Sequence, residues 1–204
     1  MTDKALIIFI KNPAVGKVKT RLAATVGNAR ALAIYQKLTA ITRQNAKLLR
    51  GVTCYLYYDN FINFTDEWSN KIFEKAAQKG GDLGIRMFHA FSDIFEKHAE
   101  AVIIGSDCPT LTAEMIEKAF DSLKKHDFVI GPATDGGYYL LGMTKGNLSM
   151  DIFKNIAWST STVAAETEQR IKTAKKTVSF LENLTDIDAE KDWNEYVQKS
   201  GLVF

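Results

Sequence analysis

Several features that define other classes of protein are rare or absent in this sequence. Its 204 residues include only two cysteines, Cys54 and Cys108, which are far apart and outside any Cys-x-x-Cys spacing. They predict two reduced thiols in a cytoplasmic protein rather than a disulfide framework. No stretch approaches the roughly 18 apolar residues of a membrane span. The N-terminal apolar run Ala5–Ile10 is too short for a signal peptide.

Strong charge of either sign is also absent. The formal net charge is +2, and the basic residues are scattered except at 11–21 and 172–176. A nucleic acid is therefore not the expected main partner, because binding to a polyanion needs a concentrated basic surface. The three histidines show no metal-ligand spacing.

Two familiar phosphate-binding motifs are missing as well. A Walker A loop needs a glycine five residues before its Gly-Lys pair and Ser or Thr directly after the lysine. Around Gly16 and Lys17 those positions hold Lys11 and Val18. The dinucleotide fingerprint Gly-x-Gly-x-x-Gly does not occur in the sequence. A phosphate site in this chain would have to be built in another way.

What is present predicts an α/β fold in one domain that spans residues 1–204. An apolar content of 46% and a charged content of 25% are typical of soluble globular proteins. Short apolar runs alternate with segments of helical spacing, which favours three α/β/α layers around a mixed, mainly parallel sheet. The expected strands are 5–10, 52–58, 101–104, 128–130, 138–143 and 177–181. The expected helices are 29–49 with Asn28 as cap, about 84–97, 112–125, 162–174 and 189–199. The segment 71–77 is either a strand or a helical turn.

The stretch Gly105-Ser106-Asp107-Cys108-Pro109 follows the buried strand 101–104. A carboxylate in this position lies at the edge of an open α/β sheet where such folds bind ligands. Pro109 stops the strand, and Gly105 allows a sharp turn before Asp107. A functional role and a simple capping or turn role for Asp107 are equally compatible with this segment alone.

Further carboxylates come later in the chain. Asp135 follows the strand 128–130, so Asp107 and Asp135 are expected to face one cleft, although Asp-Gly-Gly by itself is also typical of a turn. Asp186 and Asp188 precede the last helix, where capping it is the alternative role. Carboxylates facing basic loops suit Mg²⁺ or Mn²⁺ that bridges to the phosphate oxygens of a substrate.

The basic loops are the other half of this arrangement. The loop after the first strand contains Lys11, Lys17, Lys19 and Arg21 and leads toward a helix, where backbone N–H groups favour an anion. The alternative is a solvated basic loop. The stretch 80–86 repeats the pattern with adjacent glycines and an arginine, although a tight turn capped by its aspartate explains it equally well.

Taken together, several stretches resemble the DUF2064 family, which comprises bacterial proteins classed as glycosyltransferase-like and linked in part to arsenosugar biosynthesis. The resemblance covers about residues 5–193. The stretches are Lys11-x-Pro13-x-x-Gly16-x-x-Lys19-Thr20-Arg21-Leu22, Gly80-Gly81-Asp82-Leu83-Gly84-x-Arg86-Met87, Gly105-Ser106-Asp107-Cys108-Pro109, Asp135-Gly136-Gly137-Tyr138-Tyr139, Trp158-Ser159-Thr160 and Asp186-Ile187-Asp188.

The resemblance implies a nucleotide-diphospho-sugar transferase (GT-A) fold with Mg²⁺ or Mn²⁺ at Asp107. The GT-A motif is Asp-x-Asp, but Pro109 stands here at the second acidic position, so Asp135 or Asp188 would have to complete the metal site. The implied nucleotide and phosphate contacts are Lys11, Pro13, Gly16, Lys19, Arg21, Gly81, Asp82 and Arg86.

The leading hypothesis is a metal-dependent glycosyltransferase that uses a nucleotide-sugar donor and a small-molecule acceptor. Asp107 and Asp135 would be its catalytic residues, with Asp135 as a metal ligand or as the base toward the acceptor hydroxyl. One alternative is a nucleotidyltransferase that releases pyrophosphate, like phospholactate guanylyltransferase. Another is a nucleotide-binding protein without turnover.

Overall fold

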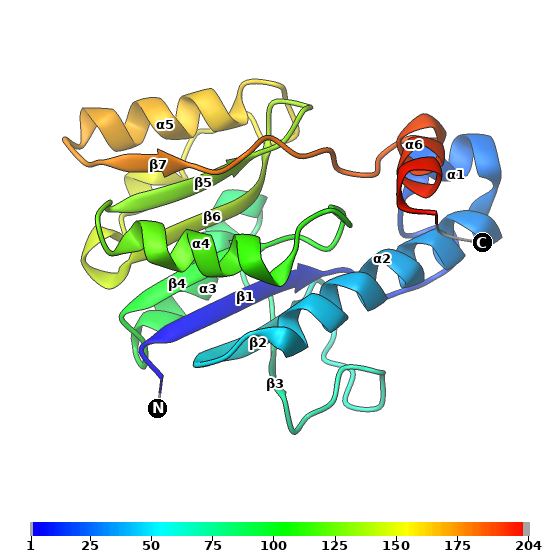
Figure 1. Ribbon diagram of the computed structural model, residues 1–204, viewed down its shortest axis with the longest axis horizontal. Helices are drawn as coiled ribbons and strands as arrows, with labels where there is room; N and C mark the ends of the chain where they lie inside the picture. The colour runs from blue at the N-terminus through cyan, green and yellow to red at the C-terminus, as the bar shows by residue number, and fades with distance from the viewer. Residues whose placement is uncertain (1, 202–204) are drawn as a thin grey trace.

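The computed structural model describes residues 2–201, and its centre is a seven-stranded sheet in the order β3-β2-β1-β4-β6-β5-β7 (Figure 1). Strand β6 runs antiparallel to its neighbours β4 and β5, whereas the other neighbouring pairs are parallel. This confirms the mixed, mainly parallel sheet. The strands are β1 (Lys4–Ile10), β2 (Val52–Tyr58), β3 (Phe73–Ala77), β4 (Glu100–Ile104), β5 (Phe128–Pro132), β6 (Tyr138–Thr144) and β7 (Val178–Phe180).

Helices cover both faces of the sheet, which is why strand β1 is apolar without alternation. Its Leu6 and Ile8 pack toward α2 (Asn28–Leu48) and α4 (Ala113–Leu123). Its Ala5 and Ile7 pack toward α3 (Leu83–Phe95) and α5 (Val163–Thr173). In Figure 1, α4 lies in front of the sheet and α3 behind it. No helix among residues 2–201 is both long and apolar enough to cross a membrane.

Two further helices lie together beyond the carboxyl end of β1. Helix α1 (Thr20–Val26) and the last helix, α6 (Glu190–Ser200), stand side by side next to α2 (Figure 1). Their shared core contains Leu22 of α1, Ile34 of α2 and Trp193 of α6. An early helix, α1, and the last helix, α6, therefore pack together at the edge of the sheet where α/β folds bind ligands.

The structure refines three of the local predictions. Residues 73–77 form a strand, which settles the undecided segment. Helix α1 was not predicted, because its residues follow the basic loop without a clear apolar period. Asn28 is the first residue of α2 rather than its cap; the cap is Gly27, whose positive φ of 81° allows the chain to reverse between α1 and α2.

Candidate functional site

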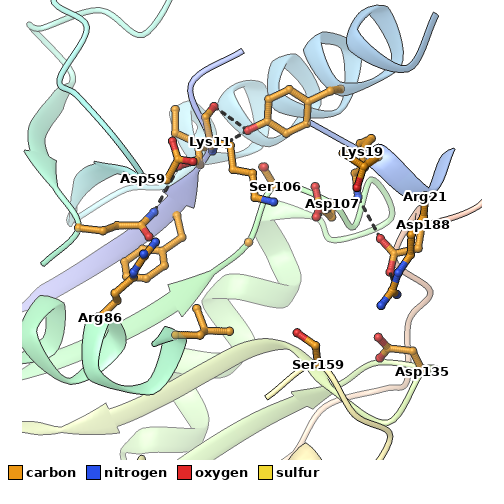
Figure 2. Close-up of a pocket in the computed structure, with 17 residues that line it drawn as sticks. Lys11, Lys19, Arg21, Asp59, Arg86, Ser106, Asp107, Asp135, Ser159 and Asp188 are labelled. Atoms are coloured by element: carbon orange, nitrogen blue, oxygen red, sulfur yellow. Dashed lines mark hydrogen bonds and ion pairs between the residues drawn. The ribbon is translucent and has the colours of Figure 1, made fainter. Parts of the chain in front are cut away.

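A pocket of about 540 Å³ opens at the carboxyl ends of the parallel strands. Figure 2 shows Lys11, Ser106, Asp107 and Lys19 along one wall, with Asp135 and Ser159 opposite. The predicted residues that line the pocket are Lys11, Lys19, Arg21, Arg86, Asp107, Asp135 and Asp188, and the others are Phe9, Ile10, Thr20, Tyr35, Asp59, Gln78, Leu83, Gly105, Ser106 and Ser159.

Four of the described residues that were expected to contact a nucleotide lie outside this lining: Pro13, Gly16, Gly81 and Asp82. Asp82 is the N-cap of α3, and its side chain accepts a hydrogen bond of 2.9 Å from the backbone N–H of Ile85. The capping role that the sequence left open is therefore present. Gly16 has a positive φ of 72°, so it shapes the loop through its backbone.

Lys19 links three segments of the site. Its Nζ lies 2.9 Å from Asp107 Oδ2 and 3.3 Å from Asp188 Oδ1, and it donates a hydrogen bond of 2.6 Å to the carbonyl of Ile187. Only 5% of the Lys19 side chain is exposed. The residue caps α1 with a φ of 48°, which is uncommon for a lysine. Arg21, which is mostly exposed, reaches the other oxygen of Asp188 at 3.4 Å.

The segment before α6 is fixed beside the loop after β4. The backbone N–H of Ile187 donates a hydrogen bond of 2.9 Å to the carbonyl of Asp107. Asp188 does not cap α6, because the N-cap is Ala189 and the Asp192 carboxylate accepts from the N–H groups of Asp188 and Ala189 at 3.1 and 2.8 Å. The side chain of Asp188 is thereby left to face Lys19 and the pocket.

Asp186 belongs to the acidic segment that the sequence singled out together with Asp188, but it is not among the residues that line the pocket. The pKa of its carboxyl is raised to about 7, mainly by burial and also by the negative charges of Asp107, Asp135 and Asp188, while Lys19 acts in the opposite direction. Its spacing of two residues from Asp188 was visible in the sequence, but its burial depends on contacts made only in the fold. One of these is the bond from the Thr134 N–H to the Leu184 carbonyl.

Asp135 lies across the pocket from Lys19 and is exposed. One of its carboxylate oxygens accepts a hydrogen bond of 2.9 Å from the N–H of Gly137, so the turn fixes the side chain while the other oxygen stays available. Asp107 and Asp135 line the same pocket, as predicted from the sequence. The turn role and the pocket position therefore coexist in this residue.

Helix α2 holds the start of the basic loop after β1 through hydrogen bonds. The hydroxyl of Tyr35 accepts a hydrogen bond of 2.8 Å from the Lys11 N–H and donates one of 2.9 Å to the Lys11 carbonyl. Burial raises the pKa of Tyr35, so this hydroxyl stays protonated. Asn12 donates its N–H to Asp59 at 2.7 Å, which joins the ends of β1 and β2. Nothing in the sequence indicated that Tyr35 holds the basic loop, because in the sequence it is one of several buried positions of a helix.

The side chains present are suitable for a divalent cation, but only together with a substrate. Carboxylate oxygens are the ligands that Mg²⁺ and Mn²⁺ prefer. Asp107, Asp135 and Asp188 supply such oxygens within one pocket. However, among residues 2–201 no three Asp, Glu, His or Cys side chains are grouped so that they could hold a metal ion by themselves. Mg²⁺ is commonly held by one or two carboxylates plus substrate phosphates, which this arrangement fits.

Comparison with solved structures defines the class of fold. A protein from Desulfovibrio desulfuricans G20, provisionally named a nucleotide-diphospho-sugar transferase, matches with a TM-score of 0.90 and 32% identity over 98% of this chain and 88% of its own. CMP:2-keto-3-deoxy-manno-octonic acid synthetase, complexed with CTP, matches with a TM-score of 0.60 and 8% identity over 98% and 100%. Rv0371C of Mycobacterium tuberculosis H37Rv, complexed with manganese, matches with a TM-score of 0.57 and 10% identity over 96% and 98%.

The fold is that of the nucleotide-diphospho-sugar transferases, as the sequence predicted. Within that class the chain belongs to the DUF2064 family, described as uncharacterized proteins conserved in bacteria, whose sequence profile matches residues 42–160. Comparison with curated proteins finds no match. The two neighbours with 8% and 10% identity share the fold alone with this chain.

Proposed function

We propose that this protein is a metal-dependent glycosyltransferase that uses a nucleotide-sugar donor and a small-molecule acceptor. The observation that carries the proposal is the distribution of charge in the pocket. Cationic side chains from the loop after β1, from α1 and from α3 share one pocket with carboxylates from four separate segments. A nucleoside diphosphate is an anion that needs such cations, and a hard divalent cation needs such carboxylates.

The departing nucleoside diphosphate develops negative charge at the bond that breaks. Lys11, Lys19 and Arg21 lie where the chain leaves β1 and enters α1, and they would stabilise that charge in the transition state. Arg86 would add a fourth cation from the first turn of α3. Asp107 with Asp135 or Asp188 would hold Mg²⁺ or Mn²⁺, which when bound would neutralise diphosphate oxygens.

Asp135 is the candidate base toward the acceptor hydroxyl. It lies opposite Lys19 and Asp107, so an acceptor bound on its side of the pocket would face the donor (Figure 2). The bond from the Gly137 N–H orients the carboxylate and leaves one oxygen for a proton. Ser159, on the same side, would contribute a hydroxyl to acceptor binding.

One observation favours a second candidate function, nucleotidyl transfer with release of pyrophosphate. Pro109 removes the second carboxylate of the Asp-x-Asp motif that is associated with GT-A enzymes. The cations around the loop after β1 would also suit the longer anion of a nucleoside triphosphate. The two candidates differ in their products, because glycosyl transfer releases a nucleoside diphosphate and nucleotidyl transfer releases pyrophosphate.

The test is a thermal-shift panel of nucleotide-sugars and nucleoside triphosphates with and without Mn²⁺, followed by product analysis with the ligand that stabilises most. A bound ligand raises the melting temperature by mass action, so no acceptor is needed at first. We expect stabilisation that depends on Mn²⁺ and is stronger with a nucleotide-sugar than with the matching triphosphate. The reverse preference, with pyrophosphate as product, would establish the second candidate instead.

The Asp107→Ala variant tests the assignment of the metal, with Asp93→Ala as its matched control. The two side chains are similarly exposed, at 43% and 45%, but Asp93 lies on α3 and pairs with Lys79 outside the pocket. We expect Asp107→Ala to lose the stabilisation that depends on Mn²⁺ and Asp93→Ala to keep it. Unchanged stabilisation in Asp107→Ala would refute the role given to Asp107.

A further inference from the structure

We infer that Lys19 is an exchangeable counter-ion, which holds Asp107 and Asp188 in the free protein and moves to a diphosphate when metal and substrate bind. The inference rests on the proposed function and adds to it. It states that the metal and the diphosphate bind cooperatively, because each depends on the movement of the same ammonium group.

The ammonium group of Lys19 has a full set of hydrogen-bond partners in the structure. An ammonium group has three N–H donors, and three oxygens surround Lys19 Nζ, at 2.6 Å from the Ile187 carbonyl, 2.9 Å from Asp107 and 3.3 Å from Asp188. The side chain is 5% exposed, whereas the two carboxylates are 43% and 44% exposed. The lysine therefore reaches the acidic pair from the protein side, and the carboxylates also face solvent.

A divalent cation at this acidic pair would compete with Lys19. An ion bound to Asp107 or Asp188 would approach an ammonium that is already in contact with both carboxylates, and like charges repel at such short range. Binding of the metal alone should therefore be weak until Lys19 moves. A buried ammonium that leaves its carboxylates needs another anionic partner.

The pocket provides a place for that partner. Lys19 lines it together with Lys11 and Arg21, so a diphosphate that contacts these cations would lie within reach of Lys19. The diphosphate would then accept hydrogen bonds from Lys19, and Asp107 and Asp188 would be left to hold the metal, whose charge would offset that of the diphosphate. By linkage, the metal then raises the affinity for the diphosphate by the same factor as the diphosphate raises the affinity for the metal.

Lys19→Met tests the competition, because it removes the ammonium and keeps a long side chain at this position. The probe is Mn²⁺ alone, and its binding is measured from the electron paramagnetic resonance signal of the free ion. Lys17→Met is the matched control, since Lys17 is an exposed lysine of the same loop outside the pocket lining. Lys19→Arg keeps the charge, so it separates the effect of charge from that of the substitution itself.

We expect Lys19→Met to bind Mn²⁺ about tenfold more tightly than the wild type, within the usual range of coupling between two sites. Lys17→Met and Lys19→Arg should bind it as weakly as the wild type. Equal or weaker binding by a folded Lys19→Met would overturn the inference. If this variant does not fold, nuclear magnetic resonance of the lysine ammonium groups in the wild type decides: we expect Mg²⁺ with pyrophosphate to shift the Lys19 signal. If Mg²⁺ alone saturates its site at Asp107 and the Lys19 ammonium signal does not shift, the proposed exchange of Lys19 is refuted.

These outcomes are distinguishable from failure of the proposed function. Tighter binding of Mn²⁺ by Lys19→Met requires neither nucleotide nor turnover, so it supports the competition whatever the reaction is. Conversely, a wild type that binds no nucleotide-sugar and no nucleoside triphosphate would refute the proposed function, even when the Mn²⁺ result is as expected.

Discussion

Gly136 lies at the turn that carries Asp135, and replacing it with alanine should be unusually destabilising. Its φ is 89°, where an L-residue is strained by roughly 1–2 kcal/mol. A Cβ at this position would also lie 2.0 Å from the backbone carbonyl oxygen of Ser161, which cannot rotate away as a side chain could. Overpacking of this kind typically costs about 1–3 kcal/mol. The expected loss for Gly136→Ala is therefore about 2–5 kcal/mol.

Gly27→Ala separates these two causes. Gly27 has a similar φ of 81°, but nothing lies within 4 Å of its added Cβ, so this variant should lose only about 1–2 kcal/mol. Urea unfolding of both variants gives the difference, with the m-value checked for constancy. The Gly136→Ala variant should also lose nucleotide-dependent stabilisation, because the clash displaces Asp135. Equal destabilisation of the two variants would refute the claim that Ser161 packs tightly against the turn.

Three further predictions concern residues around the pocket and the sheet. Tyr35→Phe removes the hydroxyl that bonds both backbone groups of Lys11, so urea unfolding should show a loss of about 1 kcal/mol, together with weaker nucleotide binding. Burial raises the pKa of Cys54 to about 12, so its thiol should react with iodoacetamide far more slowly in the native protein at pH 8.5 than after unfolding. The free energy of unfolding should also fall as the pH rises from about 8.5 toward 12, because in this range only the unfolded chain releases the thiol proton. Lys75→Met breaks a buried pair with Asp66 at 2.8 Å and should cost about 3 kcal/mol in the same urea assay, whereas no measurable change would show that the pair is neutral for stability.

The central strands β1, β2, β4, β5 and β6 were predictable from the sequence because each is a short, mostly buried apolar run, whereas β3, with Glu74 and Lys75 in its middle, was left undecided. The run 52–58 was predicted with the same limits as β2, and the meeting of Asp107 with Asp135 followed from the shared edge of parallel strands. The sequence did not show that β6 pairs between β4 and β5, because the local pattern of a strand does not specify its neighbours. Helix α1 escaped prediction for a related reason, since packing against α2 and α6 stabilises it more than its own short sequence does.

The ion pairs of the site were its least predictable part, because they join residues that are far apart in the chain. Lys19 and Asp188 are separated by 169 positions, and the bond from the Ile187 N–H to the Asp107 carbonyl is one of those that hold the Asp188 segment beside the pocket. In the proposed metal site, Asp188 would therefore take the part of the second acidic residue of Asp-x-Asp, whose position Pro109 occupies. Asp188 and Asp107 both contact Lys19, although they lie on separate segments. The acidic site therefore depends on the docking of α6 against α1 and α2, although α6 itself contributes no residue to the pocket lining among the described residues.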